Sequence, residues 1–133
     1  MSDVDWDGLR DRARALAQVA HAPYSGVRVG AAGLTDDGRV VAGCNVENAS
    51  SGLGICAEVN LCGHLVAAGG GRIVAVAVVA ADGFPLTPCG RCRQVLHEFG
   101  GPELLVDRPD GPVRLGVLLP DAFGPDDVRD RAG

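Results

Sequence analysis

The stretch Pro88-Cys89-Gly90-Arg91-Cys92-Arg93-Gln94 places two cysteines three positions apart around a glycine. The residues that follow, Gln94-Val95-Leu96-His97-Glu98-Phe99, have the spacing of an amphipathic helix that ends at Gly100-Gly101. A Cys-x-x-Cys motif where a loop meets a helix directs two sulfurs to one point, which suits a tetrahedral zinc ion. The same spacing also serves redox proteins, so this motif alone does not identify the site.

A second motif, Cys56-Ala57-Glu58, precedes Cys89 by 33 positions and lies at the expected start of another helix. It adds a third thiolate and a carboxylate. Three protein ligands leave one position of a zinc ion open, which is typical of catalytic rather than structural sites. We therefore predict that Cys56, Cys89 and Cys92 bind Zn²⁺. Glu58 would then move a proton between water and substrate; the alternative for Glu58 is a charge that stabilises the first turn of a helix.

Further segments make the chain resemble the small, homotetrameric cytidine deaminases over roughly residues 6 to 128, in the order expected for that family. The resemblance implies a zinc-dependent hydrolase that deaminates cytidine and deoxycytidine to the uracil nucleosides with release of ammonia, in pyrimidine salvage. The segments that carry it are Ala22-Pro23-Tyr24-Ser25, Val29-Gly30-Ala31-Ala32, Asn45-Val46-Glu47-Asn48, Leu53-Gly54-Ile55-Cys56-Ala57-Glu58, Pro88 to Gln94 and Leu118-Leu119-Pro120-Asp121-Ala122-Phe123.

The resemblance also implies substrate contacts. Asn45 and Glu47 would hold the sugar hydroxyls, a task that suits an amide, which donates and accepts, beside a carboxylate, which accepts. The backbone N–H of Ala57 and a carbonyl near Thr87 would fix the edge of the base.

Three further residues complete the predicted site. Val27 would line the pocket, and Phe123 would reach into the site of a neighbouring chain in a homotetramer. Arg93 is a candidate hydrogen-bond donor near the thiolates, where positive charge is needed because three thiolates and Zn²⁺ sum to −1.

The chain departs from the usual pattern of the family at three positions. Val59 stands where an Arg usually follows the glutamate, Val27 where a Phe usually lines the pocket, and Ser51 where an aromatic residue is common. The last two changes remove apolar contact and predict a weaker or roomier substrate pocket.

Other functions stay open at this point. A deaminase of the same fold acting on another aminopyrimidine, such as a nucleoside antibiotic, is favoured by Val27, Ser51 and Val59 and opposed by Glu47. A non-enzymatic zinc-stabilised module and a redox protein using Cys89 and Cys92 are the remaining alternatives. A polynucleotide substrate is disfavoured because the net charge is −5, whereas nucleic-acid binding depends on basic surfaces.

Composition predicts one domain over residues 1–133, since the length is near the commonest domain size and 47% of the residues are apolar. The polar start, Met1 to Asp7, is unlike a signal peptide, and no apolar run approaches the roughly 18 residues of a membrane span. A reducing cytoplasm is expected, because disulfides would compete with zinc ligation. We expect Cys44 and Cys62 to be buried apolar residues, and none of His21, His64 and His97 to bind the metal.

Hydrophobic periodicity predicts an α/β fold in which a mixed sheet is covered by helices on both faces. The resemblance implies that this is a three-layer α/β/α sandwich with a mixed five-stranded sheet, as in the cytidine deaminases. Helices are expected over residues 5–21, 56–68 and after Cys89, and Asp5 is a suitable N-cap. Strands are expected over residues 27–32, 39–44, 73–80, 103–106 and 113–115. The continuous apolar run at residues 73–80 predicts a central strand buried on both faces. From about residue 126 the charged tail is expected to fray.

Overall fold

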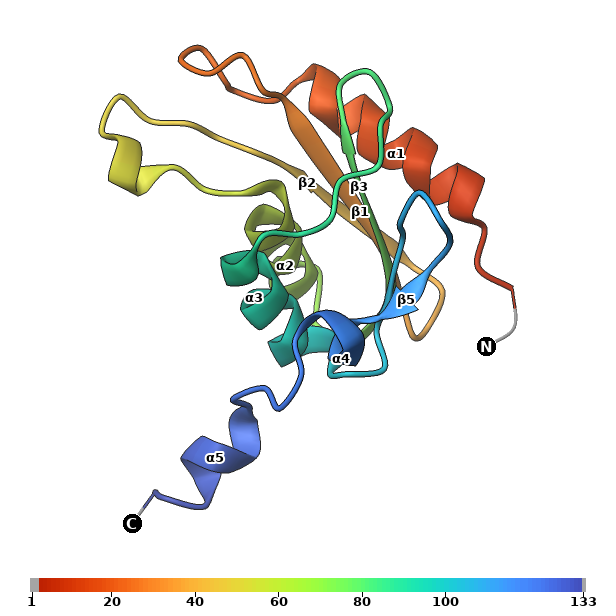
Figure 1. Cartoon of the computed structure of the whole chain (residues 1–133), viewed down its shortest axis with the longest axis vertical. Helices are drawn as coiled ribbons and strands as arrows, with labels where there is room; N and C mark the ends of the chain where they lie inside the picture. The colour runs from red at the N-terminus through yellow and green to blue at the C-terminus, as the bar shows by residue number, and fades with distance from the viewer. Residues whose placement is uncertain (1–2, 133) are drawn as a thin grey trace.

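The computed structural model describes residues 3–132 of the chain, and its centre is one mixed sheet with the strand order β2-β1-β3-β4-β5 (Figure 1). The central strand β3 is antiparallel to β1 and parallel to β4, while the outer pairs β1–β2 and β4–β5 are antiparallel. The strands are β1 (Val29–Thr35), β2 (Val40–Cys44), β3 (Ile73–Ala80), β4 (Leu105–Val106) and β5 (Val113–Arg114).

Helices cover both faces of this sheet, which gives the predicted three layers (Figure 1). Helix α1 lies on one face, and α2 and α3 lie on the other. The helices are α1 (Trp6–Gln18), α2 (Ala57–Ala67), α3 (Gly90–Gly100), the short α4 (Leu115–Leu118) and α5 (Pro125–Arg129), with a 3₁₀ turn, η1 (Ser51–Leu53). No helix within residues 3–132 is long and apolar enough to cross a membrane.

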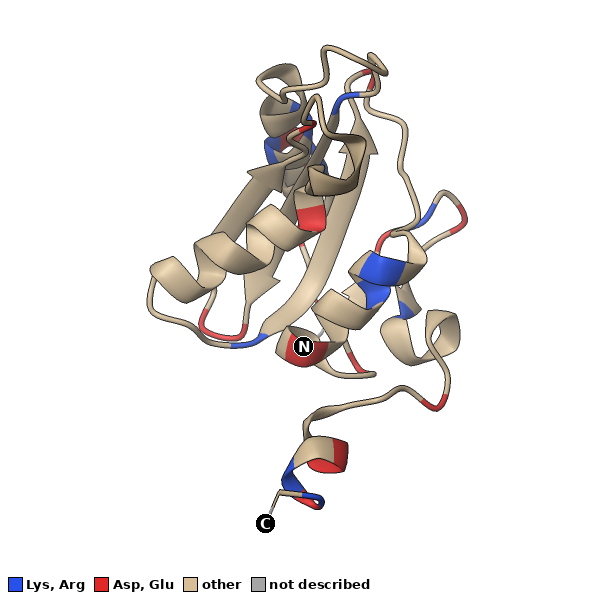
Figure 2. Cartoon of the chain, turned by 90° about the vertical axis from the view of Figure 1, so that its left-hand side faces the viewer, with Lys and Arg blue, Asp and Glu red and all other residues tan. Residues whose placement is uncertain are grey.

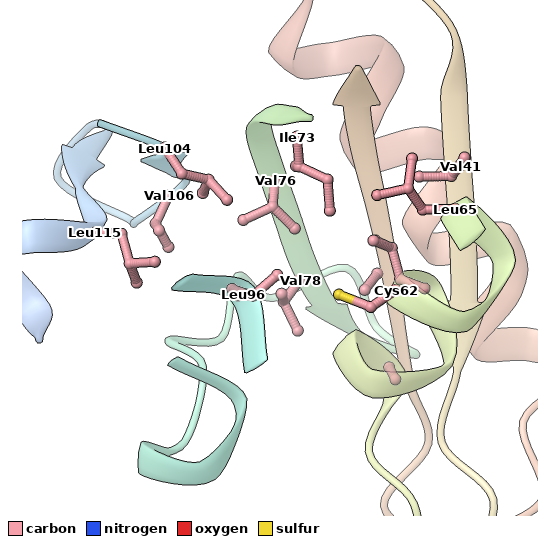
Figure 3. Packing of buried hydrophobic residues seen from close by; sticks show 13 residues of the cluster. Val41, Cys62, Leu65, Ile73, Val76, Val78, Leu96, Leu104, Val106 and Leu115 are labelled. Carbon is pink, nitrogen blue, oxygen red and sulfur yellow. The ribbon is translucent and has the colours of Figure 1, made fainter. Parts of the chain in front are cut away.

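Two apolar clusters fill the spaces between the layers. The larger one joins α2 and α3 to the sheet, and the view in Figure 3 shows the sulfur of Cys62 in α2 pointing towards Val78 of β3, with Leu65 of α2 beside Val41 of β2. The smaller one lies under α1 and is built largely from alanines and from Leu9. Small side chains let α1 lie close to the sheet, and the prediction that β3 is buried on both faces is confirmed.

Two glycines bring helices into contact with strands at one corner of the sheet. A Cβ atom at Gly30 of β1 would lie 1.8 Å from the carbonyl oxygen of Ala13 in α1. A Cβ atom at Gly43 of β2 would lie 2.5 Å from the backbone nitrogen of Leu61 and 2.7 Å from the carbonyl oxygen of Ala57, both in α2. Only a hydrogen fits at either position, so Gly43 fixes the height at which α2 lies above the sheet.

The boundaries differ from the sequence prediction in ways that local contacts explain. Helix α1 ends at Gln18, earlier than the predicted 21, and Asp5 is its N-cap as predicted, accepting a hydrogen bond from the backbone of Gly8 at 3.0 Å. Strand β1 begins at Val29, after the predicted 27, because the chain is still turning at Gly26, whose φ is 76°.

The C-terminal part also differs from the expectation of a frayed tail from about residue 126. The structure places helix α5 there, with Asp127 capping it by accepting a hydrogen bond from the backbone of Gly124 at 2.8 Å. This helix projects away from the body of the chain (Figure 1), and acidic and basic positions lie side by side on it (Figure 2).

Candidate metal centre and active site

Three cysteines from two helix starts meet at one point on the α2–α3 side of the sheet. Cys56 is the N-cap of α2, Cys89 is the N-cap of α3, and Cys92 is fully buried in the first turn of α3. Their sulfurs lie within 4.8 Å of one another. Within residues 3–132, these three cysteines form the group of side chains that could hold a metal ion. Sulfurs on a tetrahedral zinc lie about 3.8 Å apart when each Zn–S bond is about 2.3 Å, so the three residues fit a zinc ion.

The surroundings of these sulfurs also suit a cation. Burial raises the pKa of the Cys56 and Cys92 thiols, so as free thiols they resist ionisation. Burial opposes ionisation of Cys89 as well, but hydrogen bonds from Cys92, its backbone N–H foremost, bring the pKa of Cys89 below its usual value. The N-terminal ends of α2 and α3 each add about half a positive charge. A bound metal ion would offset the effect of burial, because its positive charge would stabilise all three cysteines as thiolates.

Glu58 lies beside the cysteines with its side chain turned inwards. It is the second residue of α2 and is only 5% exposed. Burial raises the pKa of its carboxyl above the usual value. No ion pair of Glu58 is found within the described part of the chain. A buried carboxyl with a raised pKa is suited to accept and return a proton near neutral pH.

A cavity of about 190 Å³ opens next to these groups. Six of the predicted site residues line it, namely Asn45, Cys56, Ala57, Glu58, Thr87 and Cys89, and the apolar residues Val29, Val78 and Leu86 complete its walls.

Two predicted pocket residues lie elsewhere. Val27 is 57% exposed and Phe123 is 62% exposed, and neither lines this cavity. Val27 belongs to the turn that precedes β1, where its backbone N–H donates to Ser25 Oγ at 3.0 Å. Phe123 lies on the C-terminal segment that leads to α5. A single chain therefore leaves both side chains free of the site.

The predicted sugar-binding residues hold the loop before β1. The Asn45 side chain accepts a hydrogen bond from Val29 N at 2.8 Å and donates one to Val27 O at 2.8 Å. The Glu47 carboxylate accepts hydrogen bonds from Tyr24 N at 3.0 Å, from Ser25 N at 3.2 Å and from the Ser25 hydroxyl. These bonds, that of the Ser25 hydroxyl foremost, keep the pKa of Glu47 below its usual value.

Sequence reasoning did not find this role of Ser25, although the residue stands in a quoted motif. The missing information was its pairing with Glu47, 22 positions away. A second cavity, of about 370 Å³, lies beside Ser25 and Glu47. It is lined by Tyr24, Ser25, Glu47, Asn48, Ala49, Ser51 and Gly54.

Arg93 supports the second cysteine motif by a route different from the expected one. Its guanidinium donates to Pro88 O at 2.8 Å and to Leu118 O at 2.9 Å. The first bond braces the peptide just before Cys89. These hydrogen bonds of Arg93 therefore go to backbone carbonyls of the surrounding loops rather than to the sulfurs.

The remaining cysteines and histidines lie outside the candidate metal centre. Cys62 is buried, which raises the pKa of its thiol to about 12, as expected for a packing residue, whereas Cys44 is only half-buried. His64 Nδ1 lies 3.1 Å from both the backbone nitrogen and the carbonyl oxygen of Ala42 in β2. His97 packs beside Gly124 on the C-terminal segment.

Comparisons with known proteins agree with this geometry. Residues 7–107 match the family model described as "Cytidine and deoxycytidylate deaminase zinc-binding region". A protein named cytidine deaminase from Mycobacterium tuberculosis is 59% identical over 128 residues, covering 96% of each chain. A second, from Halalkalibacterium halodurans, is 40% identical over 116 residues, covering 84% of this chain and 88% of that protein.

Solved structures extend the likeness to three dimensions. A crystal structure of cytidine deaminase from Mycobacterium tuberculosis superposes with a TM-score of 0.90 at 60% identity, covering 92% of this chain and 99% of that one. Another, from Burkholderia pseudomallei, gives a TM-score of 0.81 at 45% identity, covering 90% of this chain and 100% of that one.

Proposed function

Because the chain belongs to the family of the cytidine and deoxycytidylate deaminase zinc-binding region, we propose that it catalyses the hydrolytic deamination of cytidine and deoxycytidine. The observation that carries this proposal is the convergence of Cys56, Cys89 and Cys92 beside a buried carboxyl, Glu58. Three sulfur ligands with an adjacent non-ligating glutamate are the arrangement that zinc nucleobase deaminases use.

In this proposal the three cysteines hold Zn²⁺. When bound, the ion supplies the Lewis acidity that lets water act as a nucleophile at neutral pH. Glu58 would accept a proton from that water and deliver it to N3 of the cytosine ring as the oxygen adds to C4. It would then take the proton of the new C4 hydroxyl and give it to the amino group, so that the C4–N bond breaks, the C4 carbonyl forms and ammonia leaves. Its burial suits both steps, because a carboxyl with a raised pKa is a competent acid as well as a base.

The other lining residues orient the nucleoside. Ala57 and Thr87 line the cavity, and in this proposal the backbone N–H of Ala57 and a carbonyl near Thr87 hold the edge of the base. Asn45 lines the same cavity, and Glu47, two residues further along the chain, would accept hydrogen bonds from the sugar hydroxyls. Val29, Val78 and Leu86 give the ring an apolar floor.

The site of one chain is small for a nucleoside, which supports a shared site in a homotetramer. The cavity of about 190 Å³ is below the roughly 300–1,000 Å³ usual for small-molecule pockets. Water must also be kept out during the reaction. The exposed Phe123 of a neighbouring chain would supply the missing wall by stacking on the base. A reducing compartment, which we propose to be the cytoplasm, keeps the five free cysteines available.

The test is a deamination assay on pure protein with cytidine, deoxycytidine, cytosine and CMP as substrates. The reaction is monitored by the loss of ultraviolet absorbance. We expect turnover of both nucleosides, little turnover of the free base and a sedimenting species of four chains. Turnover of none of these substrates by zinc-loaded protein contradicts the function. A fully active monomer contradicts the shared site and leaves the chemistry standing.

One observation favours a second candidate, a deaminase of the same chemistry for a larger aminopyrimidine nucleoside. The cavity of about 370 Å³ beside Glu47 is bounded by the short side chain of Ser51. Space at this position would admit a substituent on the sugar. Cytosine nucleosides with enlarged sugars, added to the same assay, decide between the two candidates by their kcat/KM relative to cytidine.

A further inference from the structure

The C-terminal segment that carries Phe123 is held to the body of the chain by side chains of α3. Arg93 donates to Leu118 O at 2.9 Å, at the root of the segment. Gln94, the next residue of α3, donates from Nε2 to Phe123 O at 2.7 Å. One turn further along, His97 packs against Gly124, where an added Cβ would lie 3.1 Å from Nε2 of the ring. Three contacts from one helix thus follow the segment from its root to the start of α5.

The Gln94 contact stands alone over the middle of this segment. Within residues 3–132, it is the one hydrogen bond that joins the stretch 120–123 to the rest of the chain. Asp121 in this stretch has a φ of 52°, a left-handed conformation that few residues other than glycine adopt. A stretch with a sharp bend and little hydrogen bonding depends on its anchor for a defined position.

We propose that Gln94 is a positioning residue for Phe123, setting through the Phe123 carbonyl the direction in which the ring leaves the chain. This rests on the proposed function, in which the ring covers the substrate of a neighbouring chain. The Gln94 bond fixes the backbone and leaves the ring 62% exposed, which is the condition needed for the ring to serve another chain.

Arg93 connects this anchor to the cysteine motif. The same guanidinium that holds Leu118 O also holds Pro88 O, the peptide before Cys89. The loop that presents one zinc ligand and the segment that presents Phe123 are therefore braced against adjacent residues of one helix. If the segment shifted, the Phe123 ring would move relative to the body of its own chain. The zinc ligands of the neighbouring chain, whose substrate the ring is proposed to cover, would stay in place.

The chemistry of the amide identifies the feature to remove. A carbonyl oxygen accepts hydrogen bonds only, so the NH₂ group of Gln94 must face Phe123. Gln94→Met keeps a side chain of similar length without a donor. Glu98→Gln is the matched control, since Glu98 is an exposed α3 residue outside the described contacts with the segment.

The experiment is a double-mutant cycle on the zinc-loaded assembly, combining Gln94→Met with Phe123→Ala and measuring kcat/KM for cytidine. Loss of one hydrogen bond corresponds to about a fivefold change, so we expect Gln94→Met to lower kcat/KM by about that factor through a higher KM. In the Phe123→Ala background the same change should cost less than about twofold, because the residue that it positions is gone. Effects that multiply in the double variant would overturn the proposal.

Hydrogen exchange gives a readout that does not depend on activity. The amide hydrogens of residues 119 and 121–124 should exchange faster in Gln94→Met than in the wild type or in Glu98→Gln, with zinc content and assembly unchanged. Unchanged exchange in that segment would refute the anchor even if the enzyme is active. A wild type that is inactive on cytidine would instead refute the proposed function and with it the catalytic meaning of the anchor.

Discussion

The carboxylate of Glu47 binds Ser25 twice, through the backbone N–H at 3.2 Å and through the hydroxyl. With the further bond from Tyr24 N, three hydrogen bonds from the chain itself reach a group that is proposed to hold the sugar. A carboxylate offers about four lone-pair sites, so one remains for a substrate hydroxyl. Glu47 therefore serves both loop structure and recognition, and substitution of this residue alone would confuse the two.

Sugar recognition can be separated from loop support by comparing Glu47→Gln with Ser25→Ala. Glu47→Gln removes the charge from the group proposed to accept hydrogen bonds from the sugar hydroxyls, so we expect it to lower kcat/KM for cytidine by about 10- to 100-fold. Ser25→Ala should cost less, because the backbone bonds to Glu47 remain. On 2′,3′-dideoxycytidine the Glu47→Gln loss should shrink to that of Ser25→Ala. Equal losses with and without sugar hydroxyls would leave Glu47 with a purely structural role.

Metal binding should follow the three converging cysteines. Purified protein is expected to hold about one zinc per chain by elemental analysis. Cys89→Ala should lose metal and unfold at a lower temperature, since ligation contributes to folding. Cys44→Ala, at a half-buried cysteine away from the cluster, is the control and should keep its zinc. Full zinc occupancy in a variant lacking Cys56, Cys89 and Cys92 would place the metal elsewhere.

Proton transfer can be isolated at Glu58. Glu58→Gln preserves the size of this buried side chain and leaves all three sulfurs in place. We expect normal zinc content and thermal stability, with kcat lowered by about 10²- to 10⁴-fold, the range typical of general acid–base groups. Turnover near that of the wild type would rule out the assigned role.

Packing between β2 and α2 makes Gly43 a sensitive position. In Gly43→Ala the new methyl group would overlap the backbone of α2 at Ala57 and Leu61, so α2 must move away from the sheet. We expect a loss of about 1–3 kcal/mol in the free energy of unfolding by urea titration, typical of overpacking, together with weaker activity because Cys56 and Glu58 move with α2.

The control for that prediction is Gly63→Ala on the open side of the same helix, where an added Cβ meets nothing within 4 Å. Replacing glycine by alanine inside a helix favours folding by roughly 0.5–1 kcal/mol. The two substitutions should therefore change stability in opposite directions. A stable Gly43→Ala protein with normal turnover would show that α2 is not fixed by this contact.

The sequence predicted those features that depend on local pattern. The apolar run of β3, the N-cap at Asp5 and the helix starts at Cys56 and Cys89 follow from residue spacing, and all appear in the structure. Membership of the deaminase family followed from motifs in a fixed order, and the family model confirms it.

Long-range pairings could not be predicted in the same way. Arg10 of α1 forms two hydrogen bonds, of 2.8 and 2.9 Å, with the buried carboxylate of Asp107 after β4, and the two residues are 97 positions apart. The pairings of Ser25 with Glu47 and of Gln94 with Phe123 have the same character. Each joins residues whose local patterns contain no sign of the partner, because only the folded chain brings them together.

The close packing at Gly30 and Gly43 also limits how the sequence of this protein can evolve. Gly30 and Gly43 lie on neighbouring strands, next to each other in register through Ala31, and each faces a helix that leaves no room for a methyl group. Almost any substitution at Gly30 or Gly43 would displace a helix and destabilise the fold. Selection would therefore remove such substitutions. New substrate preferences would have to arise in the turn around residues 22–27 and the loop around residues 45–54, where the cavity beside Glu47 has space that different side chains can fill.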